Sequence, residues 1–220
     1  MRLSGEDRAA LTTTPGVNER WPVPSPDGRF LVFTTDVGGT NQLYRSGMDA
    51  GNPVAVTEGA RSYSRAAVDS SGGSLVAVEG EGEEARLVRV DVASGRIAAF
   101  GEGAGGVGVG GVGAGPSRAV PARPLGRPSL RADGTVVYSC GGSGGPDVCR
   151  AAEDGQEPRR IVTGEGEERD PVWSPDGRQI AFSSNRGGGN FEIYAARADG
   201  SRVRRLTKER GPDDQPFWVP

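Results

Sequence analysis

The sequence predicts an all-β protein, a β-propeller of about four complete four-stranded blades plus a split, incomplete fifth. The first observation is the motif Pro-Val-Trp-Ser-Pro-Asp-Gly at residues 171–177, which returns in altered form around Pro22, Ala67, Pro128 and Pro216. The second is a repeat length of 43–45 residues, which suits one propeller blade. The third is a short apolar run after each motif, which is too short for a helix.

Two independent markers establish the period. The glycines expected to close the turns lie 45, 61 and 43 residues apart, and the apolar residues that end the repeats lie 45, 44, 62 and 44 apart. The glycines are Gly28, Gly73, Gly134 and Gly177, and the apolar residues are Leu11, Val56, Phe100, Val162 and Leu206. Both long intervals contain a Gly-rich insertion that begins near Gly101, and removing its excess of about 18 residues restores the period.

Each repeat begins with a strand that leads into a tight turn. The turns at residues 25–28 and 174–177 place Ser, Pro and Gly where a type I turn prefers them. An apolar second strand follows each turn, at residues 30–33, 75–78, 136–138 and 180–182. These runs lack strict alternation of polar and apolar residues, which indicates strands that neighbouring sheets cover on both faces.

The second half of each repeat predicts two further strands. The third strands are expected at residues 42–44, 86–88, 147–149 and 192–194. Polar turns follow near Asp49, Ser94, Asp154 and Asp199, and a last strand then ends at the apolar marker residue. Four strands per repeat result, as in a propeller blade.

The fourth repeat resembles the WD40-like repeat of TolB-type β-propellers. It has the motif at residues 170–177, an Ile-Ala-Phe-Ser-Ser strand with Asn185-Arg186, and then Ile193-Tyr194, Asp199-Gly200 and Arg-Leu-Thr at residues 205–207. The first repeat matches well, the third in outline and the second poorly, so the resemblance covers residues 8 to 220 apart from the insertion. It implies a fold but no single function, because the family includes periplasmic scaffolds, sensor domains and propellers attached to peptidases.

The repeats also predict how the chain is divided. We expect residues 1–18 to hold the outer strand of a preceding repeat and a connector, 19–100 the first two repeats, and 101–125 the Gly/Pro-rich insertion or linker. Residues 126–212 should hold the third and fourth repeats, and 213–220 the first strand of a truncated fifth. The two central strands of the fifth are missing, so we expect a piece of a larger propeller, an open arc, or a ring with imperfectly paired termini. An open arc would favour self-association through its exposed edges.

Composition limits the function classes. The 220 residues carry a formal net charge of −3, whereas nucleic-acid binding normally requires a basic surface. No run approaches the roughly 20 apolar residues of a membrane span, and the amino terminus lacks the apolar core of a secretory signal. We expect a soluble chain of unknown compartment, although the resemblance implies a periplasmic or extracytoplasmic location.

The residue types present also limit the catalytic and metal-binding chemistry of the chain. The chain has no histidine, which removes Ser-His-Asp triads, Cys-His pairs and most zinc sites. A Gly-x-Gly-x-x-Gly match at residues 108–113 precedes prolines rather than the helix that a dinucleotide site requires. Two acidic clusters lack the spacing of a known calcium loop, so we interpret them as solvated loop carboxylates. They are Glu81, Glu83 and Glu84, and Glu165, Glu167, Glu168 and Asp170. We assign no catalytic, cofactor-binding or metal-binding residue.

Cys140 and Cys149 lie in the third repeat, with eight residues between them across a Gly-rich hairpin tip. Cysteines on neighbouring strands meet the Cα spacing of roughly 4.4 to 6.8 Å that a disulfide requires. A disulfide and two buried free thiols both remain open at this point.

These features predict a non-enzymatic scaffold for protein–protein interaction or sensing, with a protein partner and no nucleic acid. The alternative is an accessory peptide- or glycan-binding propeller of a hydrolase or peptidase carried on other sequence. Binding residues tend to lie on the loops of a rigid scaffold. By alignment, the turns around Asp27, Asp133 and Asp176 should lie together at one end of the central channel.

Overall fold

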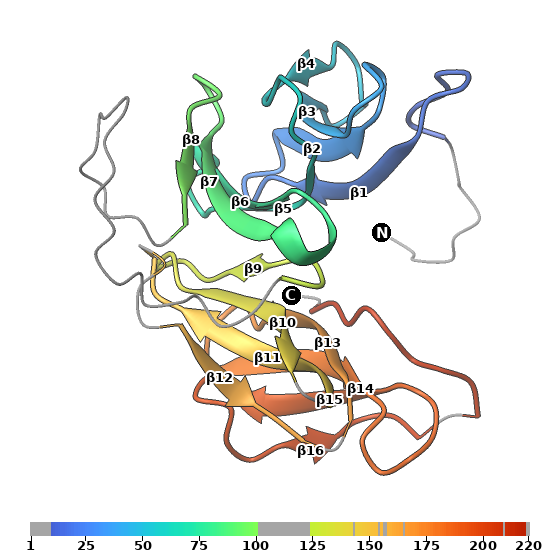
Figure 1. Cartoon of the computed structure of the whole chain (residues 1–220), viewed down its shortest axis with the longest axis vertical. Helices are drawn as coiled ribbons and strands as arrows, with labels where there is room; N and C mark the ends of the chain where they lie inside the picture. Colours follow the sequence, from blue (N-terminus) through green and yellow to red (C-terminus); the bar gives the residue numbers. More distant parts are fainter. Residues whose placement is uncertain are drawn as a thin grey trace.

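A computed structural model describes residues 10–100, 124–142, 144–153, 155, 158–164, 166–208 and 210–218. These residues form four four-stranded antiparallel sheets and one short 3-10 helix, Gly82–Glu84. The sheets follow one another along the chain and stand around a common centre (Figure 1). This arrangement confirms the predicted all-β propeller of four blades.

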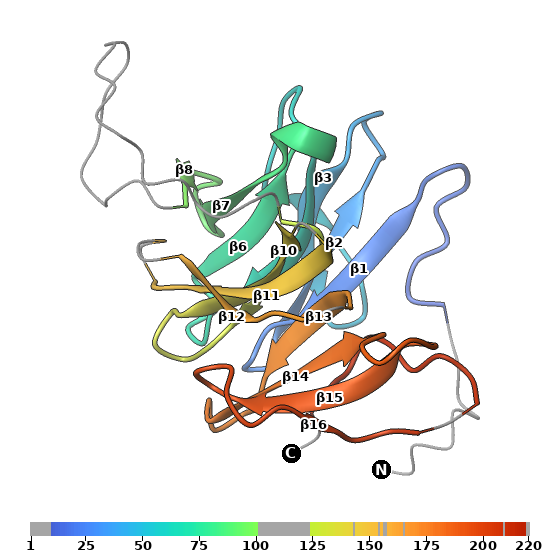
Figure 2. The ribbon, with the colours of Figure 1, turned by 60° about the horizontal axis from the view of Figure 1, so that its bottom comes forward.

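The strands of each blade run in chain order from the centre outward, as the fourth blade shows in Figure 2. The first blade contains β1 (Glu19–Pro24), β2 (Phe30–Thr35), β3 (Gln42–Gly47) and β4 (Val54–Ala55). The second contains β5 (Tyr63–Val68), β6 (Ser74–Glu79), β7 (Arg86–Asp91) and β8 (Ile97–Ala99). The third contains β9 (Ser129–Leu130), β10 (Val136–Gly142), β11 (Gly145–Ala151) and β12 (Arg159–Val162). The fourth contains β13 (Glu168–Trp173), β14 (Gln179–Ser184), β15 (Glu192–Arg197) and β16 (Arg204–Arg205).

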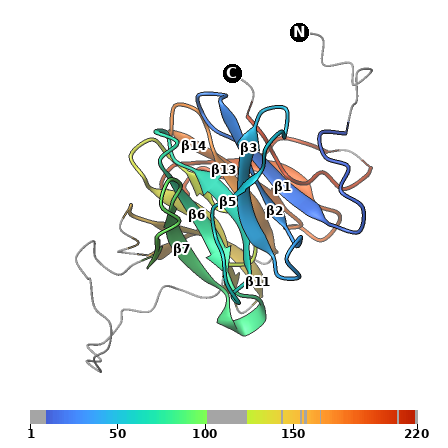
Figure 3. The ribbon, with the colours of Figure 1, turned by 90° about the horizontal axis from the view of Figure 1, so that it is seen from above.

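Apolar clusters hold neighbouring blades together. One cluster joins β2 and β3 to β5, β6 and β7, which lie side by side in Figure 3. A second joins β6 and β7 to β10 and β11, and a third joins β10 and β11 to β13, β14 and β15. Every residue of β2 is buried, as the unalternating apolar runs predicted. Among the described residues, none of these clusters joins the fourth blade to the first.

Tight turns connect the first two strands of each blade. In the first blade the Gly28 amide donates to the Ser25 carbonyl at 2.9 Å, and the Ser25 hydroxyl donates to the Asp27 carboxylate at 2.6 Å. In the second blade the prediction of which glycine closes the turn was wrong by one residue. Gly72, with φ of 73°, donates to the Asp69 carbonyl at 3.1 Å, because Asp69 occupies the position that Ser25 has in the first blade.

The predicted fifth blade is not confirmed. Residues 10–18 and 210–218 contain no strand, and residues 1–9, 219 and 220 lie outside the described part of the chain. Residues 101–123 of the insertion, which include the Gly-x-Gly-x-x-Gly match, also lie outside it. At its carboxyl-terminal end, Pro124 forms a β-bridge with Cys140. No helix of the described residues is long and apolar enough to cross a membrane.

Candidate functional site

The innermost strands of the blades surround a central cavity. Residues of β1, β5, β9 and β13, together with residues 215–217, line a volume of about 780 Å³. The 215–217 segment lies beside the fourth blade, where the Trp218 indole N–H donates to the Val172 carbonyl at 3.2 Å. Five chain segments therefore face one cavity, although only four of them belong to sheets. We call this cavity the central channel.

A bulge repeats at one end of the inner strands. In β1, β5 and β13 the register with the second strand shifts by one residue, between Arg169 and Val172 in the fourth blade. The residues at this position have a left-handed backbone although none is glycine, with φ of 52° at Trp21, 54° at Arg65 and 48° at Asp170. Gln215 has φ of 51° at the same position of the motif. Such strain costs about 1–3 kcal/mol for each residue and occurs preferentially at functional sites.

We call this end of the channel the mouth, defined by Trp21, Arg65, Arg127, Asp170 and Gln215. All five line the cavity, and Arg127 precedes Pro128 as Asp170 precedes Pro171. The guanidinium of Arg65 lies 4.9 Å from the centroid of the Trp21 ring. These residues were not predicted from the sequence, although the position before a motif proline, which holds Trp21, Arg127, Asp170 and Gln215, would have indicated four of them.

The Asp170 carboxylate lies in an unusual environment at the mouth. Burial raises its pKa, and so does the nearby Asp214 carboxylate, while Arg127, Arg169 and Arg65 offset part of that rise. Neither the Asp170 carboxylate nor the Arg127 guanidinium forms an ion pair or a hydrogen bond with any described residue. Gly126 leaves room for Asp170, because a Cβ there would lie 3.2 Å from the carboxylate oxygen Oδ1. Among the residues that line the cavity, the mouth therefore contains one carboxylate and two guanidinium groups.

The opposite end of the channel is formed by the turns between the first and second strands. Neighbouring turns contact one another there, with the Ser70 hydroxyl 3.5 Å from the Ala132 carbonyl and Arg131 3.5 Å from the Gly177 carbonyl. These contacts place the turns around Asp133 and Asp176 side by side, as predicted, and they do not test the position predicted for the turn around Asp27. The Arg131 hydrogen bond holds the pKa of Asp133 well below its usual value.

Glu168 and Asp170 were wrongly interpreted as solvated loop carboxylates. Glu168 begins β13 and is fully buried, where it pairs with Arg186 at 2.9 Å and accepts a hydrogen bond from the Ser184 hydroxyl at 3.1 Å. Asp170 is partly buried at the channel mouth. Adjacent blades and strands bury these two carboxylates, and a local pattern of charges does not predict such contacts. Of the other carboxylates in these clusters, Glu165 lies outside the described residues.

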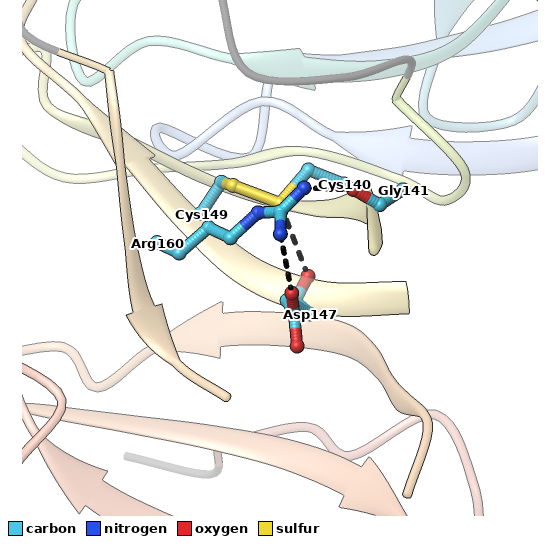
Figure 4. The surroundings of a disulfide bond; sticks show 5 residues. All are labelled: Cys140, Gly141, Asp147, Cys149 and Arg160. Atoms are coloured by element: carbon cyan, nitrogen blue, oxygen red, sulfur yellow. Dashed lines mark hydrogen bonds and ion pairs between the residues drawn. A yellow bond between two sulfur atoms is a disulfide. The ribbon is translucent and has the colours of Figure 1, made fainter. Parts of the chain in front are cut away.

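The structure joins Cys140 and Cys149 by a disulfide, with their Cα atoms 5.8 Å apart (Figure 4). Tyr138 pairs with Cys149 and Cys140 pairs with Asp147, so the cysteines are diagonal neighbours on one face of the β10–β11 hairpin. Arg160 lies beside them and bonds the Asp147 carboxylate at 3.3 Å. Both cysteines are fully buried. The disulfide stays a prediction for the protein in solution, where thiol alkylation measures whether the two cysteines are oxidised.

Metal ligands do not gather in the described part of the chain, which contains no group of three His, Cys, Asp or Glu side chains suited to an ion. A second cavity, of about 490 Å³, lies between the first two blades and includes Arg29, Arg45 and Asp49 in its wall. Arg45 covers the Phe30 ring there, 4.6 Å from its centroid. The central channel remains the larger of these two cavities and the one in which equivalent residues of several repeats meet.

No protein-family model and no curated protein matches the sequence. Among solved structures, TolB from Acinetobacter baumannii aligns with a TM-score of 0.67 and 13% identity, over 86% of this chain and 43% of that TolB. A candidate TolB from Agrobacterium tumefaciens aligns with a TM-score of 0.63 and 16% identity, over 90% of this chain and 83% of the other. The chain has a TolB-like β-propeller fold.

Enzymes share this fold. An oligogalacturonate lyase, solved in complex with manganese, aligns with a TM-score of 0.61 and 20% identity, over 90% of this chain and 55% of the lyase. The chain thus spans less than half of the Acinetobacter TolB and little more than half of the lyase. At these identities the similarity to TolB shows the fold alone, and the function depends on the residues of the site.

Proposed function

We propose that this TolB-like propeller is a non-enzymatic scaffold that binds a segment of a partner protein at its central channel. The observation that carries the proposal is the mouth, where strained backbone holds Arg65 and Asp170, whose charged side chains form no ion pair with the described residues. Side chains held in this way are available to a ligand, and their geometry is fixed before the ligand arrives.

The size and lining of the channel support a polypeptide ligand. Its volume of about 780 Å³ lies within the 300–1,000 Å³ of typical ligand pockets. Pro22, Pro128, Pro171 and Pro216 provide an apolar wall next to the charged mouth. A peptide offers amide donors to Asp170, carbonyl acceptors to the arginines, and side chains to the apolar wall.

The lack of histidine supports a role without catalysis. Nucleophiles such as serine are weak unless an adjacent base activates them, and histidine is the most frequent such base. Purified protein is therefore expected to give no turnover of generic ester or peptide substrates above background. Turnover that one substitution in this chain abolishes would overturn the non-enzymatic part of the proposal.

The second candidate is an accessory propeller that binds a glycan or peptide for a hydrolase or peptidase on other sequence. The pairing of an aromatic ring with charged side chains at Trp21, Arg65 and Asp170 favours it, because sugars also bind such surfaces. Binding to an oligosaccharide panel, with no binding to peptides, would select this candidate.

A peptide-array experiment tests the proposal directly. Labelled protein is applied to an array of random decapeptides, and the hits are measured in solution with the wild type and the Trp21→Ala and Asp170→Asn variants. The matched control is Arg178→Ala, whose exposed side chain lies in the β13–β14 turn at the other end of the channel. We expect at least tenfold weaker binding for the mouth variants and less than twofold change for the control. Equal affinities for all four proteins would place binding elsewhere and refute the proposal.

A further inference from the structure

We propose that the channel mouth recognises the free carboxylate at the C-terminus of a peptide, with Arg65 and Arg127 as its anion-binding side chains. This inference rests on the proposed function and adds the chemistry of the ligand to it.

The two arginines are free to bind an anion. Arg65 stacks on the Trp21 ring, with 4.9 Å between the guanidinium carbon and the ring centroid. Stacking restrains the guanidinium and leaves its N–H groups, which lie in its plane, open to an acceptor. Arg127, from the neighbouring blade, is exposed and has no ion-pair partner within the described residues. Guanidinium groups of this kind bind a carboxylate through two parallel N–H···O bonds.

The channel wall supplies few other donors. The residue that follows the mouth position is proline in four of the five segments, namely Pro22, Pro128, Pro171 and Pro216. Proline has no backbone N–H, so the wall offers no amide donor at these four positions. An anion that enters the mouth is therefore bound by the side chains of Arg65 and Arg127 rather than by backbone amides.

Asp170 discriminates among anions. Asp170 lines the same cavity, its carboxylate carries no ion pair with the described residues, and Arg65 and Arg127 are near enough to lower its pKa. An anion without a donor would be repelled by this carboxylate. The C-terminal residue of a peptide has both groups, because its amide N–H lies next to its carboxylate and donates to Asp170. The arrangement thus fits a peptide terminus better than an inorganic anion.

Paired peptides provide the test. Each array hit is synthesised with a free C-terminal acid and with a C-terminal amide, and both forms are titrated into the wild type by fluorescence anisotropy. We expect the acid to bind at least tenfold more tightly than the amide. Arg127→Ala and the conservative Arg65→Gln variant should reduce that ratio below threefold, while the Arg178→Ala control keeps it. A thermal melt of each variant confirms that it is folded.

The outcomes separate this inference from the function on which it rests. Equal binding of acid and amide at the channel overturns the carboxylate inference and leaves the proposed function standing. Absence of peptide binding overturns both. A tenfold preference for the acid that survives both arginine substitutions overturns the assignment to Arg65 and Arg127. Displacement of the peptide by an oligogalacturonate at micromolar concentration, with tighter binding than any peptide acid, overturns the inference in favour of an acidic glycan.

Discussion

Gly200→Ala should destabilise the protein more than the matched change Gly28→Ala. Both glycines close a tight turn with a left-handed backbone, at φ of 85° and 68°, and each donates its amide to the first residue of the turn, at 2.8 Å and 2.9 Å. They differ in what surrounds them. A Cβ at Gly200 would lie 1.8 Å from the carbonyl oxygen of Ile161, in the third blade, whereas a Cβ at Gly28 would have no heavy atom within 4 Å.

The size of the difference follows from these distances. A left-handed backbone costs an L-residue about 1–2 kcal/mol, and both variants carry that cost. Only Gly200→Ala also has to move the Ile161 carbonyl away, and overpacking of this kind costs about 1–3 kcal/mol more. We therefore expect Gly28→Ala to lose about 1–2 kcal/mol of unfolding free energy and Gly200→Ala about 2–5 kcal/mol.

Urea unfolding followed by tryptophan fluorescence measures both losses, since three tryptophans report on the blades. The comparison is valid where the slope of unfolding free energy against urea is the same in the two variants. Equal losses would show that the turn of the fourth blade does not pack against β12, and would refute the assigned contact between the third and fourth blades.

Three further predictions concern pH, redox state and association. Glu79 is buried, which raises its pKa, but hydrogen bonds from Arg86 and Tyr63 outweigh burial and hold the pKa below its ordinary 4.5. The stability that the Glu79 carboxylate contributes is present above pH 4.5 and is lost as the pH falls below it. Glu79→Gln should therefore reduce the slope of unfolding free energy against pH on the acid side. An unchanged slope would contradict this prediction. Under oxidising conditions Cys140 and Cys149 should resist alkylation in unfolded, unreduced protein, and Cys140→Ser with Cys149→Ser should lose about 2–3 kcal/mol; two alkylated cysteines in the wild type would exclude the bridge. The free chain should self-associate as its concentration rises in analytical ultracentrifugation, because no apolar cluster of the described residues joins the fourth blade to the first and an incompletely closed ring exposes strand edges. A monomer at all concentrations that melts sharply above about 65 °C would contradict this prediction.

The local pattern determined the blades. The turns at residues 25–28 and 174–177 depend on hydrogen bonds that span only a few residues, such as Ser174 to Asp176 at 2.6 Å. Apolar runs such as residues 180–182 then follow directly, so strand order and repeat length could be predicted from sequence. The one-residue error at Gly73 arose where the second repeat replaces Ser-Pro-Asp-Gly by Asp69 and its neighbours, and two glycines compete for the closing position.

Only the tertiary structure decided which polar residues are buried and which meet at a site. Glu168 is a loop carboxylate by sequence, yet its partner Arg186 follows the end of β14, the strand that pairs with β13. Trp21, Arg65 and Asp170 lie more than 40 residues apart from one another along the chain, and they converge because each blade directs its inner strand toward the same centre. The period of the sequence gives equivalent positions, but it carries no distances between blades. Those distances follow from packing of the sheets against one another, and they determine the chemistry of the channel.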